Sequence, residues 1–276
     1  MIGAAGFVGR AVTDRLVADG LSVLALGRST VDLLSTNAAD RLADLLSDGD
    51  VIVAAAARAP CKNLDMLIEN MTMVRAMLDA IARVAVAHVV NVSSDAVYGD
   101  EPVPLHEASA TAPGSLHGAM HLAREIAFRE LSVPLAIVRP TLIYGAADPH
   151  NGYGPNRFRR LAAAGEPIVL FGDGEERRDH VHIDDVAEMI AHIVMHRSTG
   201  LLNIASGAVH SFRAIADLVA AQYGNAVEVR RTKRTGPMPH GGYRPFDISA
   251  IEAAFPRLRM TQLVDGIKRV HRTVQR

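Results

Sequence analysis

The stretch that decides the fold opens the chain and reads Gly3-Ala4-Ala5-Gly6-Phe7-Val8-Gly9. Its GxxGxxG spacing leads directly into a segment with helical periodicity, Gly9 to Asp19, and then into an apolar, strand-like run, Leu21 to Leu26. A glycine-rich turn at a helix N-terminus lets backbone N–H groups approach a pyrophosphate. We therefore expect residues 3–9 to bind a nucleotide, although the motif taken alone could be a plain glycine turn.

Only Met1 and Ile2 precede this loop, whereas the motif requires a strand there, normally a central one. A two-residue stub would leave neighbouring strands with unpaired backbone groups, which are costly when buried. We therefore expect either that the natural chain begins a few residues upstream or that the chain is compromised as it stands.

Short apolar runs alternate with helix-period segments in the first half of the chain. Strands are predicted at Leu21–Leu26, Val51–Ala55, His88–Val92 and Pro134–Val138, and helices at Gly9–Asp19, Ala38–Ser47 and Asn63–Val84. This alternation predicts an α/β fold with a doubly wound parallel sheet of the Rossmann type. We assign residues 1–144 to this domain, with its first strand cut short and with 176–207 returning to it.

After about residue 140 the alternation loosens, and residues 145–276 are assigned mainly to a smaller C-terminal lobe. The predicted elements are a long loop at Gly145–Arg157, helices at Arg157–Ala164 and Ile183–His196, strands at Ile168–Phe171 and Leu201–Ala205, and a helix capped by Ser211 and running to Tyr223. His180 and His182 alternate along a strand, and we interpret both as structural.

Composition excludes several classes of protein. The formal net charge of −1 favours neither nucleic acid nor an anionic membrane surface. Every apolar run is broken well short of the ~18 residues that a membrane-spanning helix needs, and no signal peptide is evident. The single cysteine, Cys61, fits a reducing compartment. We expect a soluble, cytoplasmic protein.

The end of the second predicted strand bears on the choice of dinucleotide. Sheets that prefer NAD tend to carry an acid there for the ribose 2′-hydroxyl, but this chain has Gly27-Arg28-Ser29. A guanidinium and a hydroxyl suit a 2′-phosphate, so we expect NADP to be preferred over NAD. Alternatively, Arg28 is an ordinary solvated charge. Asp32 could contact the adenine or could equally cap a turn.

The motifs together resemble the extended short-chain dehydrogenase/reductase family, and more narrowly its nucleotide-sugar epimerases, dehydratases and reductases. They are, in chain order, the glycine loop, Asn70, Val92–Gly99, Gly118 to Glu125, Arg139-Pro140, Tyr144-Gly145, Gly154–Asn156, Phe171–Gly174, Arg178-Asp179 with Asp184–Val186, and Asn203–Gly207. The resemblance implies cofactor contacts from Gly3, Gly6, Phe7, Val8, Gly9, Arg28, Ser29, Ala54, Ala55, Asn70 and His121. It also suggests a homodimer formed by Asn63–Val84 and Pro113–Leu131.

In that family a Ser or Thr after this strand positions the substrate oxygen, and Ser94 matches it, with Asp95 beside it on the substrate side. Such a hydroxyl hydrogen-bonds a developing alkoxide. The alternative is that Ser94 only caps the strand end. The related dehydratases have an Asp-Glu pair where this chain has Asp95-Ala96. We therefore expect reduction or epimerisation and not 4,6-dehydration.

The family's catalytic YxxxK pair is replaced here by His117 and His121. In one interpretation His117 exchanges a proton with the substrate oxygen, because imidazole titrates near neutral pH, and His121 bonds the ribose of the cofactor. In another, the catalytic pair is lost and the protein is a silent NADP-binding sensor or partner-binding protein. A metal site at this i, i+4 pair has no identified third ligand, and we expect none.

The resemblance places substrate contacts at Asn156, Arg178 and Arg234. Arg178 and Arg234 match arginines that bind the substrate's diphosphate, for which a bidentate guanidinium is suited. Alternatively, Arg178 forms an ion pair with Asp179 or Asp184, and the basic run 230–234 is a solvated strand edge. We expect an NADP- or NAD-dependent oxidoreductase or epimerase acting on a nucleotide-linked sugar.

Overall fold

The computed structural model describes residues 1–224 and 226–274. They form two compact units, each assembled from separate parts of the chain. Unit 1 comprises Met1–Gly99, Glu107–Pro140 and Val186–Ile204. Unit 2 comprises Asp100–His106, Thr141–Asp185 and Ala205–Arg276.

Unit 1 is built on a parallel sheet with strand order β1-β2-β3-β7, as expected for a Rossmann-like fold. The strands are β1 (Val51–Ala54), β2 (His88–Val92), β3 (Leu135–Pro140) and β7 (Gly200–Ile204). β2 is buried along its whole length, which explains why it is rich in valine and lacks an alternation of apolar and polar residues. The predicted α/β class is therefore confirmed.

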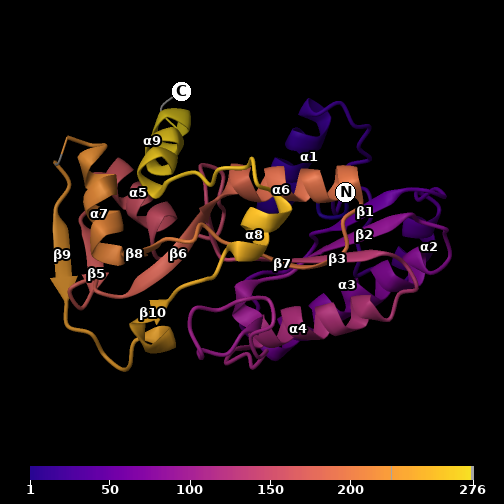
Figure 1. The fold of residues 1–276 in the computed structure, drawn as a ribbon, viewed down its shortest axis with the longest axis horizontal. Helices are drawn as coiled ribbons and strands as arrows, with labels where there is room; N and C mark the ends of the chain where they lie inside the picture. The colour runs from indigo at the N-terminus through magenta and orange to yellow at the C-terminus, as the bar shows by residue number, and fades with distance from the viewer. Residues whose placement is uncertain (225, 275–276) are drawn as a thin grey trace. The chain divides into compact units, whose positions relative to one another are not determined.

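Helices cover both faces of this sheet (Figure 1). They are α1 (Phe7–Ala18), α2 (Ala38–Ala43), α3 (Leu64–Ile81), the short η1 (Asp95–Val97), α4 (Leu116–Arg129) and α6 (Ile183–His196). Met77 of α3 and Phe128 of α4 pack with Ile52 and Val89 of the sheet in one buried apolar cluster. α3 and α4 thus share one face of the sheet, and α1 lies with α6 on the other.

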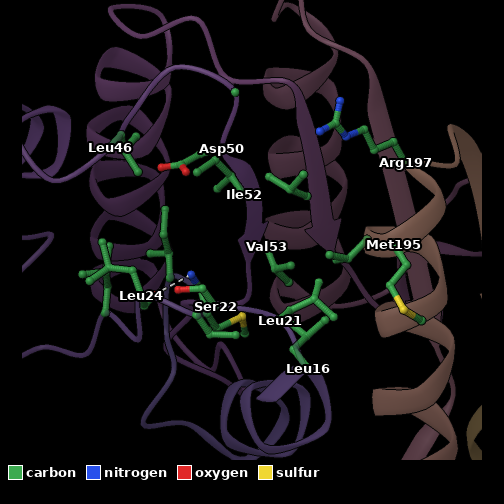
Figure 2. Close-up of a pocket in the computed structure, with 17 residues that line it drawn as sticks. Leu16, Leu21, Ser22, Leu24, Leu46, Asp50, Ile52, Val53, Met195 and Arg197 are labelled. Carbon is green, nitrogen blue, oxygen red and sulfur yellow. Dashed lines mark hydrogen bonds between the residues drawn. The ribbon is translucent and has the colours of Figure 1, made fainter. Parts of the chain in front are cut away.

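The predicted strand Leu21–Leu26 is wrong as a strand. Of these residues Leu26 alone forms a β-bridge, an isolated parallel one with Ile2, which also bridges Ala54 of β1. The Leu24 carbonyl adds one bond from the Met1 amino group at 2.9 Å. A strand needs a partner along its length, and its neighbour here is the two-residue segment Met1-Ile2, so the ladder ends after one bridge. A cavity of about 360 Å³ lies beside Met1, lined by Leu21, Leu24 and residues of β1 (Figure 2).

Ile2 nevertheless occupies the switch point of the sheet. Its N–H donates to Val53 and its carbonyl accepts from Ala55, while Leu26 donates to Met1. The chain next reaches the sheet at Leu26, on one side of Ile2, and then at β1, on the other side of Ile2. The strand order therefore reverses at Ile2. In doubly wound sheets ligands bind at the carboxyl ends of the strands at such a reversal of order, where the glycine loop begins here.

Unit 2 is smaller and mixed. Its strands are β4 (Leu142–Tyr144), β5 (Ile168–Phe171), β6 (Arg177–His182), β8 (Val209–Ser211), β9 (Val229–Thr232) and β10 (Tyr243–Arg244), and its helices are α5 (Pro155–Ala163), α7 (Phe212–Ala221), η2 (Pro239–Gly242), α8 (Ser249–Ala254) and α9 (Leu263–Val274). β6 lies between β4 and β10, and β5 pairs with β9. Phe158, Phe212 and Ile215 anchor its core. Ser211 caps α7 as predicted, since its hydroxyl accepts from Ala214 N–H.

No helix among residues 1–224 and 226–274 combines the length and the hydropathy needed to cross a membrane.

Candidate active site

The glycine loop turns tightly into α1, and two of its glycines leave no room for a side chain. Gly3 has a φ of +89°, and a Cβ there would lie 2.6 Å from the backbone nitrogen of Ala56. A Cβ on Gly9 would lie 2.0 Å from the carbonyl oxygen of Gly3. α1 begins at Phe7 with Gly6 as its N-cap, so the positive end of the helix dipole lies at the loop.

A cavity of about 240 Å³ adjoins the loop within unit 1. Its walls are largely apolar, and Arg28 and Asp32 are among the few charged side chains that line it. The lining also includes Gly3, Gly6, Leu26, Val31, Leu33, Ala55 and Met73. Apolar walls with a few placed polar groups are typical of pockets for small ligands and cofactors. Together with glycines whose Cβ atoms would fill the loop, this cavity fits the adenosine end of a dinucleotide.

Arg28 and Asp32 lie together at this cavity. Arg28 Nε donates to the Asp32 carboxylate at 3.3 Å, and the Arg28 side chain is 79% exposed. Asp32 also accepts from the Leu34 N–H at 3.1 Å, and this bond, ahead of Arg28, lowers the pKa of the carboxyl. Asp32 therefore caps a turn, which was one of its two predicted roles. Ser29 lies exposed in the adjoining turn.

Asn70 acts on the segment that follows β1. Its amide oxygen accepts from the Arg58 N–H at 2.9 Å, and its amide nitrogen donates to the carbonyls of Arg58 and Met66 at 3.1 and 2.7 Å. The side chain is 1% exposed. Asn70 thus fixes residues 55–58 beside the glycine loop, next to Ala54 and Ala55 at the end of β1.

Ser93 and Ser94 follow β2 but have different partners. Ser93 is buried, and its hydroxyl donates to Glu125 Oε1 at 2.6 Å, so it is structural. The Ser94 hydroxyl caps η1 by accepting from the Ala96 N–H at 3.2 Å, and it lies 3.4 Å from Asp95 Oδ1. Ser94 is only partly buried and lies at the carboxyl end of the parallel sheet, the edge at which ligands bind in sheets of this kind.

The Ser94 segment packs directly on the helix that carries the two histidines. A Cβ on Gly118 of α4 would lie 2.0 Å from the carbonyl oxygen of Ala96. Only glycine permits this approach between η1 and α4. The contact fixes Ser94 and Asp95 against the first turn of α4, beside His117, and Ser115 caps that turn by accepting from the Gly118 N–H at 3.2 Å.

His117 and His121 form an edge-to-face pair with ring centroids 4.7 Å apart. His117 Nδ1 accepts from the Cys61 N–H at 3.4 Å, which assigns the proton of the neutral ring to Nε2. His121 is 6% exposed, and burial, followed by His117 and Arg124, lowers its pKa well below the ordinary value. His121 is therefore neutral at physiological pH, and its Nδ1 is buried without a hydrogen-bond partner among the described residues.

Arg124 is a site residue that the sequence did not reveal. It is 1% exposed, and its guanidinium donates to the carbonyls of Ala54 and Ala56 at 2.6 Å each and to Asn91 Oδ1 at 2.5 Å. These acceptors are neutral, and burial lowers the pKa of Arg124 to about 10. The only hint was its place one turn after His121, next to the matching Glu125. It ties α4 to the segment that packs against Gly3.

Of the residues predicted to bind substrate, Ser94 and Asp95 lie in unit 1 with His117 and His121. Unit 2 contains the other three, Asn156, Arg178 and Arg234. Asn156 is buried at the start of α5, where its amide oxygen accepts from the Gly145 N–H at 3.1 Å and its nitrogen donates to the Ile143 carbonyl at 3.3 Å. Its side chain therefore shapes the loop after β4.

Arg178 and Arg234 come together at one acid, Glu176. Arg178 Nη2 lies 2.5 Å from Glu176 Oε1, and Arg234 Nη1 lies 3.5 Å from Glu176 Oε2. The sequence suggested Asp179 or Asp184 as alternative partners of Arg178. Asp179 instead accepts from Thr141 and Ser206, and Asp184 pairs with Arg269.

No group of three or more His, Cys, Asp or Glu side chains in the described part of the chain is placed to hold a metal ion.

Comparisons with known proteins identify the family of the chain. The model of the NAD dependent epimerase/dehydratase family matches residues 1–205. A UDP-glucose 4-epimerase of Mycolicibacterium smegmatis is 31% identical over 222 residues, which cover 67% of this chain and 69% of the relative. A dTDP-4-dehydro-6-deoxy-D-allose reductase of Streptomyces bikiniensis is 26% identical over 83% of this chain and 82% of its own length.

The fold also matches solved structures. A UDP-glucose 4-epimerase of Thermus thermophilus, in complex with NAD, superposes with a TM-score of 0.83. The match covers 99% of this chain and 97% of that one, at 23% identity.

Proposed function

The chain belongs to the NAD dependent epimerase/dehydratase family, and we propose that it is a nicotinamide-dependent epimerase or reductase of nucleotide-linked sugars. The observation that carries the proposal is the approach of the Ala96 carbonyl to Gly118, which holds Ser94 against the helix of His117 and His121. A hydroxyl and two imidazoles thus lie at the carboxyl end of a sheet with a dinucleotide loop. The relatives supply the substrate class, since their names specify UDP- and dTDP-sugars.

A nicotinamide dinucleotide, when bound, supplies hydride to a sugar carbon or takes hydride from it. The chain's own residues must then handle the proton of the sugar oxygen. His117 does so in this proposal: the imidazolium donates a proton from Nε2 to the sugar oxygen in reduction, and an unprotonated Nε2 takes it up in oxidation. The second step requires the neutral ring to carry its proton on Nδ1 and so to give up the 3.4 Å bond from the Cys61 N–H. Ser94 donates a hydrogen bond to the same oxygen and stabilises the charge that develops there.

His121 has a different role from His117, because burial keeps it neutral. A neutral buried imidazole cannot share the acid/base work near pH 7, but it can hold a hydroxyl. We assign its buried Nδ1 to a ribose hydroxyl of the cofactor. Arg124 positions the Ala54–Ala56 segment by donating hydrogen bonds to the carbonyls of Ala54 and Ala56.

For the choice of dinucleotide, we propose a preference for NADP, supported by the guanidinium of Arg28 and by the lack of an acid at residues 27–29. Asp32 takes the Nε of Arg28, so a 2′-phosphate would have to share that guanidinium or displace the carboxylate. The Thermus thermophilus structure was solved with NAD, so the preference requires a direct test. NADPH and NADH titrations of wild type and Arg28→Ala supply it: only NADPH binding should weaken in the variant.

We further propose a homodimer that buries the outer surfaces of α3 and α4. Leu64, Ile68 and Ile126 are each more than half exposed there. Large apolar side chains grouped on adjacent helices support a contact of this kind. Light scattering of wild type and of a Leu64→Lys/Ile68→Lys variant tests it, since the variant should be monomeric. A cytoplasmic location is proposed from the free, buried Cys61.

The function is tested by incubating the purified protein with NAD and a panel of UDP- and dTDP-hexoses, and with NADPH and the corresponding keto-sugars. Interconversion of 4-epimers or oxidation of NADPH is the expected result. Tight dinucleotide binding with no turnover of any panel member would refute the proposed activity.

A further inference from the structure

Two guanidinium groups of unit 2 face a single buried carboxylate. Glu176 is 9% exposed in its side chain, Arg178 6% and Arg234 18%. Glu175 also lies near Arg234, at 3.5 Å, but it is 45% exposed, so water screens its charge much more strongly. Glu176 is the acid that both arginines share with little access to water.

The surroundings hold these side chains in place. The Glu176 carbonyl accepts from the Phe212 N–H at 3.0 Å, which fixes the turn before β6 against the start of α7. Arg178 Nη2 also donates to the Pro239 carbonyl at 2.6 Å, and Arg234 Nη2 donates to the Phe171 carbonyl at 3.1 Å. Each arginine is therefore held by a backbone carbonyl as well as by Glu176. The Glu176 carboxylate contacts both guanidinium groups.

A carboxylate in this position changes which anion the pair prefers. Two guanidiniums alone favour the most highly charged phosphate available. With Glu176 between them, every negative charge on the ligand is also repelled by a carboxylate within a few ångströms, in surroundings of low effective dielectric. The penalty grows with the charge of the ligand.

A nucleotide-sugar and the free nucleoside diphosphate differ in their negative charge. The terminal phosphate of a free nucleoside diphosphate has a second pKa of about 6, as phosphate monoesters do. At pH 7.5 a nucleoside diphosphate therefore carries about one more negative charge than the nucleotide-sugar, whose terminal phosphate is esterified.

We propose that Glu176 is a specificity-determining residue that makes the Arg178–Arg234 pair discriminate against free nucleoside diphosphates and in favour of diphosphate-linked sugars. The inference rests on the proposed function, because it takes these two arginines as the diphosphate site. The enzyme would thereby avoid inhibition by the nucleoside diphosphate that sugar transferases release.

The test compares wild type with Glu176→Gln, which keeps the shape and an acceptor oxygen but removes the charge. Calorimetry at pH 7.5 gives the Kd of UDP and of UDP-glucose, and in parallel of dTDP and dTDP-glucose. Glu228→Gln is the matched control, since it removes one charge from an exposed pair with Arg230 in the same unit. The Kd of NADH, measured on each variant, reports whether unit 1 remains intact.

In Glu176→Gln we expect the Kd of the free diphosphate to fall about tenfold and that of the sugar ester only about threefold. The ratio of the two Kd values, which measures the preference for the sugar ester, should therefore decrease by about threefold. Glu228→Gln should leave both within about twofold of wild type. An unchanged or weaker affinity for the diphosphate in Glu176→Gln, or an equal gain for both ligands, would overturn the role of Glu176 alone. If wild type binds NADH but neither member of either pair, both the nucleotide-sugar assignment and this inference fail.

Discussion

Glu125 and Arg139 form a bidentate ion pair at the centre of unit 1, with oxygen–nitrogen distances of 2.8 and 2.6 Å. Neither side chain is more than 3% exposed. Ser93 donates to the same carboxylate, so the pair joins α4 to the ends of β2 and β3. The helix that carries His117 and His121 is thus fixed to the sheet by a buried, hydrogen-bonded charge.

Removing one partner of this pair should destabilise the protein strongly. Glu125→Ala leaves the Arg139 guanidinium buried without its counter-charge, and we expect the free energy of unfolding to fall by about 3–5 kcal/mol. Urea denaturation measures it. Glu130→Ala, at the exposed end of α4, is the control and should cost less than about 1 kcal/mol. A similar small cost for Glu125→Ala would contradict the structural role of the pair.

Gly118→Ala should impair catalysis more than cofactor binding. Its methyl group would meet the Ala96 carbonyl and push the Ser94 segment away from α4. A displacement of about 1 Å in such a site costs on the order of 100-fold in turnover. Gly114→Ala, where a Cβ would have no neighbour within 4 Å, is the matched control. Turnover in Gly118→Ala equal to that of the control would mean that Ser94 is not positioned by this contact.

Acid should weaken the fold through His180. Burial lowers the pKa of His180 to about 3, whereas in the unfolded chain a histidine takes up its proton near pH 6.5. The unfolded state then binds more protons below pH 6.5, so stability is fully present above that pH and is lost as the pH falls toward 3. Between pH 6.5 and 5 this group contributes a loss of about 2 kcal/mol.

His180→Phe should therefore flatten the dependence of unfolding free energy on pH. Urea denaturation at pH 7.5, 6 and 5 measures the slope. His150→Gln, on an exposed loop, should leave the slope as in wild type. An unchanged slope in His180→Phe would show that His180 does not stay neutral in the folded protein.

Arg124 should prove necessary for a well-formed cofactor site. Arg124→Met leaves the carbonyls of Ala54 and Ala56 without their buried donor and frees the segment that contacts Gly3. We expect the Kd of NADH to rise about tenfold, since a buried charged hydrogen bond contributes about 1.5–3 kcal/mol. Arg124→Lys should recover part of this affinity. If NADH binds Arg124→Met as tightly as wild type, Arg124 supports only the fold.

Much of the fold follows from local sequence. His88–Val92 and Ile168–Phe171 are strands over the predicted residues, because short apolar runs between breaks can be buried only as strands here. The Ser211 cap was also predictable, since a hydroxyl before a helix-period segment is a local signal. Leu21–Leu26 failed because a strand depends on a partner elsewhere in the chain.

Long-range partners also limited prediction of the site. The glycine loop, Ser94 and the two histidines were predicted for the site from the order and spacing of motifs. Arg124 was missed because an arginine on a helix is usually solvated, and its carbonyl acceptors come from a strand about 70 residues away. The sharing of Glu176 by Arg178 and Arg234 depends on the fold of unit 2, which no local pattern specifies.

The most direct test of the central claim is the pH dependence of kcat for wild type and His117→Phe, using the nucleotide-sugar that turns over best and monitoring NADH affinity in both. We expect wild type to show a pH-dependent limb that His117→Phe lacks, and His117→Phe to lose at least about 100-fold in kcat while binding NADH normally. Undiminished turnover in His117→Phe, with the limb of wild type retained, would remove His117 from the mechanism.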